Sequence, residues 1–135
     1  MEITQETDYA VRCVLYLSET GSDRPVMIET IAADMCIPRS FLAKILQKLA
    51  KAKIVRSFRG ARGGFQLACK PKDISLLKVV EAIEGPVAMN RCTVEPKRCG
   101  FSRTCTVHPV WKSLRKVVSD YLAATDFEMI MKPRK

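Results

Sequence analysis

Three cysteines and the only histidine of the chain lie in one short stretch, "RCTVEPKRCGFSRTCTVH", at residues 91–108. Cys92, Cys99, Cys105 and His108 follow the spacing C-x6-C-x5-C-x2-H. Thiolate sulfurs and a neutral imidazole nitrogen are donors that bind zinc and iron-sulfur clusters in proteins. Four such donors within 17 residues can close around one site, so the sequence predicts a metal or cluster site in this loop.

The spacing leaves three kinds of site open. Cationic residues surround the thiols at Arg91, Lys97, Arg98 and Arg103, and this charge offsets that of an anionic cluster, which favours iron-sulfur chemistry. A structural zinc ion is the first alternative, because zinc fingers use a related spacing. The second alternative is a set of bare thiols that forms a disulfide on oxidation.

The composition indicates one globular domain that stays in the cytoplasm. The 135 residues are 47% hydrophobic, which is enough for a packed core without disulfide bonds. No run of 18 apolar residues occurs, and "MEITQETDYA" lacks the features of a signal peptide, so we expect no membrane partner. Thiols stay reduced in the cytoplasm, which favours metal binding by the clustered cysteines. The isolated Cys13, Cys36 and Cys69 are expected to be buried.

The charge of the chain is concentrated in one block. The net charge is +9, and ten Lys or Arg but no Asp or Glu occur from Arg39 to Lys72. A solvated surface normally mixes both signs, so this block predicts a nucleic-acid partner.

The basic block coincides with a predicted winged helix-turn-helix. A helix over 4–19 precedes two short helices that are separated by "CIPRS", where Pro38 ends one helix and Ser40 caps the next. The second of the pair should bury Phe41, Leu42, Ile45, Leu46 and Leu49 and expose Arg39, Ser40, Ala43, Lys44, Gln47 and Lys48. Alternating residues around "RGARGG" then predict a β-hairpin, the wing.

This arrangement assigns roles in DNA binding. Arg39, Ser40 and Lys44 lie where a recognition helix reaches base edges in the major groove. Arg59 and Arg62 at the wing tip are suited to the minor groove, and Gly63 and Gly64 permit close backbone approach. Phosphate contacts are expected from Lys48, Lys51, Lys53 and Arg56.

The C-terminal half of the sequence indicates that the chain pairs with a second subunit. "ISLLKVVEAIEG" reads as a helix that ends at Gly85, and "PVWKSLRKVVSDYLAAT" carries an apolar seam typical of a helix that packs against a partner helix. We therefore expect a homodimer, and the alternative is that this helix packs within one subunit, against the first helix. The predicted fold is mainly α with a small β-hairpin wing: a winged helix-turn-helix at 1–75, a linker helix and cluster-binding loop at 76–108, and a dimerisation helix with a C-terminal tail at 109–135.

The sequence resembles the iron-sulfur winged-helix transcriptional regulators of the IscR, NsrR and RirA type. The resemblance covers nearly the whole chain through "TDYAVR", "IPRSFLAKILQKLAKAKIVRSFRGARGGFQLA", "ISLLKVVEAIEG" and the three-cysteine loop. It implies a dimeric bacterial regulator of double-stranded operator DNA, expected to be a repressor that senses iron, redox or nitric oxide status. In that family a cluster in the loop alters the DNA-binding head.

The resemblance also bears on the cluster ligands. The sequence "CTVH" is similar to the IscR pattern, which implies a [2Fe-2S] cluster held by Cys92, Cys99, Cys105 and His108. Asp8 in "TDY" matches the position from which NsrR-type proteins reach a [4Fe-4S] cluster across the dimer, so Asp8 of the partner subunit is the alternative fourth ligand. The x6 gap differs from the x5 of IscR, and Ala43 replaces an acidic specificity residue, so operator sequences cannot be carried over.

Enzymatic activity is not expected. The sequence contains no Ser-His-Asp set, P-loop or dinucleotide fingerprint. The alternative from another class is a zinc-stabilised nucleic-acid-binding protein directed at RNA. The aromatic content of 7% disfavours it, because single-stranded bases stack on aromatic side chains.

Overall fold

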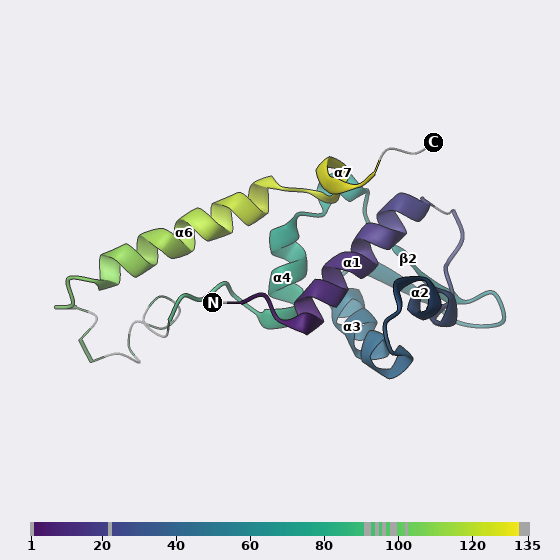
Figure 1. The fold of residues 1–135 in the computed structure, drawn as a ribbon, viewed down its shortest axis with the longest axis horizontal. Coiled ribbons are helices and arrows are strands. Elements are labelled where there is room, and N and C mark those ends of the chain that lie inside the picture. Colours follow the sequence, from purple (N-terminus) through teal and green to yellow (C-terminus); the bar gives the residue numbers. More distant parts are fainter. Residues whose placement is uncertain are drawn as a thin grey trace.

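The computed structural model describes residues 2–21, 23–90, 93, 95, 97, 100–101 and 103–132. Its elements are α1 (Gln5–Thr20), α2 (Ile28–Met35), α3 (Arg39–Lys51), β1 (Val55–Phe58), β2 (Gly64–Leu67), the 3-10 helix η1 (Pro71–Asp73), α4 (Leu76–Glu84), α6 (His108–Ala124) and α7 (Phe127–Ile130). Helices α1 to α4 and the hairpin form a head, from which α6 extends (Figure 1). This architecture confirms the predicted fold class of a mainly helical protein with a two-stranded wing.

Helix α1 forms the centre of the head and is capped at both ends. The hydroxyl of Thr4 accepts a hydrogen bond from the backbone N–H of Thr7 at 3.2 Å. Gly21 ends the helix with φ 54°, a left-handed conformation that glycine adopts without steric cost. Ala10, Val14 and Leu17 of this helix face the core, and Cys13 lies fully buried beside them.

Helices α2 and α3 form the predicted helix-turn-helix, with one difference at the start of α3. The N-cap residue is Pro38, which makes no side-chain capping hydrogen bond, and Ser40 lies inside the helix. The predicted capping role of Ser40 is therefore wrong. The helix instead begins at Arg39, directly after the extended backbone of Pro38, so its N-cap lies two residues earlier than the serine signal indicated.

The buried face of α3 matches the prediction except at its first apolar residue. Leu42, Ile45, Leu46 and Leu49 are fully buried, whereas Phe41 is 38% exposed. Phe41 instead packs edge-to-face against Tyr9 of α1, with ring centroids 5.7 Å apart. Its position, about 100° around the helix from Leu42, places it at the edge of the core.

The wing follows α3 directly and has the predicted antiparallel pairing. Its register runs from Val55 opposite Leu67 to Phe58 opposite Gly64. At Gly64, which has φ 150°, an added Cβ would overlap the backbone of Val26, whose N–H and carbonyl pair with Phe65 at 2.8 Å. Glycine at this position therefore allows the wing to lie close to the segment that precedes α2.

The C-terminal segment returns to the head after α6, which the sequence did not predict. The N–H of Leu76 donates to the carbonyl of Thr125 at 2.8 Å, and the N–H of Phe127 donates to the carbonyl of Ile74 at 3.1 Å. Phe127, the first residue of α7, is fully buried in the core cluster. Asp126 caps α7 by accepting from the N–H of Met129 at 2.9 Å. Within the described ranges, no helix is long and apolar enough to cross a membrane.

Candidate nucleic-acid interface and cysteine loop

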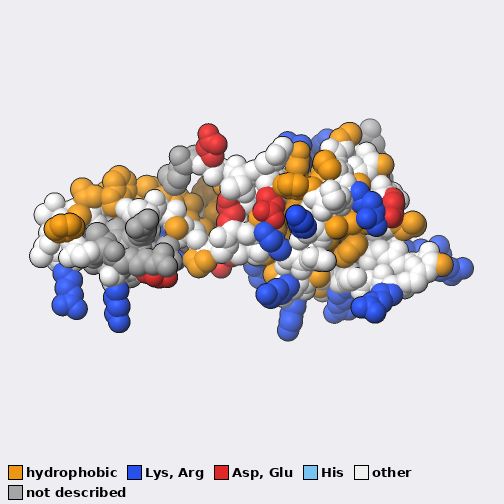
Figure 2. All heavy atoms as spheres, turned by 90° about the horizontal axis from the view of Figure 1, so that it is seen from below, with side chains coloured by type: hydrophobic (Ala, Val, Ile, Leu, Met, Phe, Trp, Pro, Cys, Tyr) orange, Lys and Arg blue, Asp and Glu red, His pale blue; other side chains and the backbone are white. Residues whose placement is uncertain are grey.

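The outer face of α3 presents the side chains expected to reach DNA. Arg39, Ser40, Lys44 and Lys48 are all exposed, while the opposite face of the helix is buried in the core. Lys and Arg side chains project around the edge of the head in the view from below (Figure 2). The described head therefore exposes an outer α3 face with cations along its length.

The wing, which follows α3 in the chain, adds further exposed cations. Arg56 in β1 and both predicted tip residues, Arg59 and Arg62, are exposed. Gly63 and Gly64 are half-buried, and a Cβ at Gly63 would overlap the carbonyl oxygen of Phe58. These two glycines therefore shape the turn that holds the arginines outward, a role that is independent of any contact with DNA.

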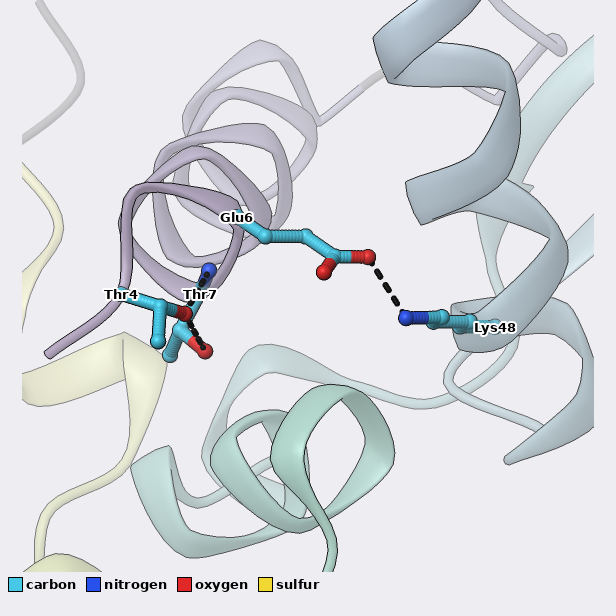
Figure 3. Close-up of polar contacts among 4 residues, drawn as sticks. All are labelled: Thr4, Glu6, Thr7 and Lys48. Carbon is cyan, nitrogen blue, oxygen red and sulfur yellow. Dashed lines mark hydrogen bonds and ion pairs between the residues drawn. The ribbon is translucent and has the colours of Figure 1, made fainter.

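Two cations of the α3 face are paired with carboxylates from neighbouring helices. Nζ of Lys48 lies 2.6 Å from Oε1 of Glu6 in the first turn of α1 (Figure 3). Nε of Arg39 lies 3.1 Å from Oε1 of Glu29 in the first turn of α2. Both carboxylates lie outside the basic block of the sequence, so inspection of that block alone could not reveal these pairs.

The environment of Glu29 keeps its carboxylate ionised. Its pKa is lowered first by a hydrogen bond from its own backbone N–H and then by the hydrogen bond from Arg39. A carboxylate in the first turn of a helix also interacts favourably with the positive end of the helix dipole. Glu29 is therefore an anionic partner for Arg39 at neutral pH.

The cysteine loop is described in part. Cys92 and Cys99 lie outside the described residues. Cys105 is a half-buried free thiol, and its backbone N–H donates to the carbonyl of Phe101 at 2.7 Å. Among the residues that are described, no group of three or more His, Cys, Asp or Glu side chains is arranged to hold a metal ion.

His108 opens helix α6, and its imidazole has an unusual environment. Its Nδ1 atom is buried and has no hydrogen-bond partner among the described atoms. Buried polar atoms in proteins almost always have such a partner. A neutral imidazole nitrogen with a free lone pair can serve as a metal ligand, so this donor fits the predicted site.

Asp8, the alternative ligand, lies on α1 in a different setting. Its carboxylate forms an ion pair with Arg12, with Oδ2 3.0 Å from Nη2. The Asp8 side chain is 48% exposed. It is therefore open to a second molecule, but a ligand role would have to compete with Arg12.

Arg115 of α6 fixes the segment next to Cys92, which sequence patterns did not single out. Its Nε donates to the carbonyl of Val87 at 2.6 Å, and its Nη1 donates to the carbonyl of Thr93 at 2.8 Å. The Thr93 side chain is buried and donates to the carbonyl of Asn90 at 2.9 Å. One guanidinium thus ties the beginning of the cysteine loop to the dimerisation helix predicted from the sequence.

The three isolated cysteines have different environments. Cys13 is buried, as expected, and burial raises the pKa of its thiol to about 12. Cys36 and Cys69 are exposed, so the prediction of burial is wrong for both. Cys36 adopts the left-handed conformation that ends α2, with φ 54°, and Cys69 lies in the bend after β2, so neither side chain faces the core.

Comparison with known proteins gives one family for nearly the whole chain. Residues 3–133 match the Rrf2 family model, described as "Iron-dependent Transcriptional regulator". The transcriptional regulator IscR of Aliivibrio salmonicida is 30% identical over 122 residues, which cover 90% of this chain and 72% of that protein.

Two solved structures share the fold. IscR from T. potens has a TM-score of 0.76 at 22% identity, with 96% of this chain and 85% of that chain covered. CymR, the global cysteine regulator of B. subtilis, has a TM-score of 0.73 at 24% identity, with 96% and 95% covered. These structural matches support the winged-helix architecture.

Proposed function

The chain belongs to the Rrf2 family of DNA-binding transcriptional regulators, and we propose that it is a homodimeric repressor whose binding to operator DNA depends on an iron-sulfur cluster. The family contains regulators, and no enzymatic role is assigned to this chain. A regulator acts where the DNA is, so we also propose a cytoplasmic location.

The proposed DNA contacts follow from the exposed cations. The N-terminal end of α3 presents Arg39, Ser40 and Lys44 to base edges in the major groove. Arg59 and Arg62 of the wing are assigned to the adjacent minor groove, whose negative potential attracts guanidinium groups. The remaining cations, Lys48, Lys51, Lys53 and Arg56, are assigned to phosphates, which fix the register of the protein on the duplex.

The proposed dimer follows from the apolar surface of α6. Val110, Trp111, Val117 and Tyr121 are exposed by 57%, 39%, 62% and 71%. A groove of about 420 Å³ between α6, the end of α4 and the N-terminal segment extends this apolar surface. A contiguous apolar surface of this kind is characteristic of an interaction site, and we assign it to a second copy of the chain.

The proposed cluster site rests on His108. We infer that the cluster is [2Fe-2S] and that its ligands are Cys92, Cys99, Cys105 and His108. The alternative is a [4Fe-4S] cluster, whose fourth ligand would be Asp8 of the partner subunit. The buried, unpartnered Nδ1 of His108 supports the choice of this residue. A cluster of this type, when bound, supplies a redox-active centre that is sensitive to oxygen and nitric oxide.

The chain itself offers a route from the loop to the head. His108 is the first residue of α6, and Arg115, two turns later, holds the base of the loop. At the other end of α6, Thr125 and Phe127 bond to the backbone around the start of α4. A ligand that favours one position of α6 therefore changes the contacts between the C-terminal segment and the head. Ligand binding and DNA binding must then affect one another reciprocally.

The cluster is tested by anaerobic purification, followed by an ultraviolet-visible spectrum and assays for iron, sulfide and zinc. We expect broad visible absorption with about two iron and two sulfide per chain. About four of each would transfer the ligand assignment from His108 to Asp8. A colourless protein with about one zinc per chain would refute the cluster and leave a structural zinc site.

DNA binding is tested separately by measuring affinity for a selected duplex between 50 and 200 mM salt. With several phosphates contacted, the affinity should fall by roughly three orders of magnitude or more over this range. Arg62→Ala should weaken binding to the selected duplex. An affinity that is indifferent to salt would exclude the proposed interface, whatever the metal content of the protein.

A further inference from the structure

Arg39 is the first residue of the recognition helix, and only one edge of its guanidinium is engaged by Glu29. The ion pair uses Nε, 3.1 Å from Oε1 of Glu29. An arginine side chain has five N–H donors in a fixed planar fork, so this contact leaves the four donors of Nη1 and Nη2 for other acceptors. The same fork is suited to paired acceptors such as O6 and N7 of guanine.

Glu29 reaches Arg39 from the preceding helix. It lies in the first turn of α2, and its carboxylate pairs with Nε of Arg39. The side chains of Arg39 and Glu29 are 63% and 55% exposed, and pairs this exposed add little to folding stability. The position of the pair, at the junction of the helix-turn-helix, therefore calls for an explanation other than stability.

We propose that Glu29 is a positioning residue for operator recognition, which holds the guanidinium of Arg39 so that its Nη edge is oriented before DNA arrives. This inference rests on the proposed role of Arg39 at base edges. A flexible arginine loses side-chain entropy when it binds, and an arginine that is already held loses less. This smaller loss of entropy raises the affinity most for the operator, where Arg39 must adopt one orientation. The gain in affinity is smaller for other DNA, which Arg39 contacts without a fixed geometry.

The other ion pair of α3 provides a matched control. Glu6 holds Lys48 near the opposite end of the same helix at 2.6 Å. An ammonium group is a point charge with rotatable donors and has no fork to orient. Glu6→Gln and Glu29→Gln remove the same charge beside the same helix, but only the second should alter sequence discrimination.

The experiment begins with the full-length wild-type protein and a pool of random duplexes. The enriched duplex and a scrambled duplex of the same composition are then titrated with wild type, Glu29→Gln and Glu6→Gln at one salt concentration. For Glu29→Gln we expect the ratio of enriched to scrambled affinity to fall about 2- to 10-fold per half-site. For Glu6→Gln we expect both affinities to rise together, with the ratio unchanged.

A second measurement uses Arg39→Lys, which keeps the charge but removes the fork. In this background Glu29→Gln should leave the affinity ratio unchanged. An equal fall of the ratio in Glu29→Gln and Glu6→Gln, or a full effect of Glu29→Gln in the Arg39→Lys background, would overturn the positioning role alone. If no duplex is enriched by the wild-type protein, the proposed function fails first and this inference fails with it.

Discussion

Replacing Phe127 by alanine tests whether the C-terminal segment completes the core of the head. The Phe127 side chain is fully buried and packs in the same cluster as residues of α1, α3 and α4. Removing a fully buried phenylalanine costs about 3–5 kcal/mol, because the transfer free energy is lost and a cavity remains. A domain of this size has a free energy of unfolding of about 5–15 kcal/mol, so the variant should lose a large part of its stability.

The assays are urea unfolding and thermal melting, both monitored by circular dichroism at one fixed protein concentration. For a chain of this length, each kcal/mol corresponds to roughly 3–5 °C in melting temperature, so a loss of about 3–5 kcal/mol should lower the melting temperature of Phe127→Ala by roughly 9–25 °C. The denaturant slope should stay unchanged, because the same surface becomes exposed on unfolding.

Met129 supplies the control, because it lies in the same short helix and is 65% exposed. Met129→Ala should change the free energy of unfolding by no more than about 0.5 kcal/mol. A Phe127→Ala variant that loses less than about 1 kcal/mol, or that behaves like Met129→Ala, would show that Phe127 does not lie in the core of the head in solution.

Three further predictions concern the loop, the dimer and the isolated thiols. His108→Ala should lower the iron content and visible absorption after anaerobic purification, and an unchanged spectrum would remove His108 from the ligand set. Val117→Glu, which puts a charge on the apolar face of α6, should shift the protein toward a monomer in sedimentation analysis; an unchanged mass would exclude this face as the interface. With iodoacetamide at pH 8, Cys36 and Cys69 should react in the native protein, whereas Cys13, with a pKa of about 12, should react only after unfolding; rapid labelling of Cys13 would contradict its burial.

The head could be predicted from the sequence because its signals are local. The 3.6-residue period fixed the buried face of α3, and glycines between alternating residues fixed the wing. Phe41 shows the limit of this reasoning, because a helical period does not say where the edge of the core lies. Ser40 shows a second limit of this reasoning. A serine near a helix start need not be the cap, because here the helix already begins directly after Pro38.

The contacts that could not be predicted join residues far apart in the chain. Lys48 and Glu6 are 42 positions apart, and no sequence period relates them. Arg115 likewise acts on backbone carbonyls of Val87 and Thr93, which carry no side-chain signal. Of the candidate metal site, the sequence indicated the ligand types and their spacing. The unpartnered nitrogen of His108 became visible only from the burial of its Nδ1 atom in the structure.

The position of Phe127 also sets an order for the synthesis of the molecule. The core of the head contains residues of α1, near the start of the chain, and Phe127, near its end. During translation the N-terminal helices emerge first, but this core cannot be complete until Phe127 has left the ribosome. By then the cysteine loop and all of α6 have been made. A fully packed DNA-binding head therefore forms only on a chain that already carries its own cysteine loop.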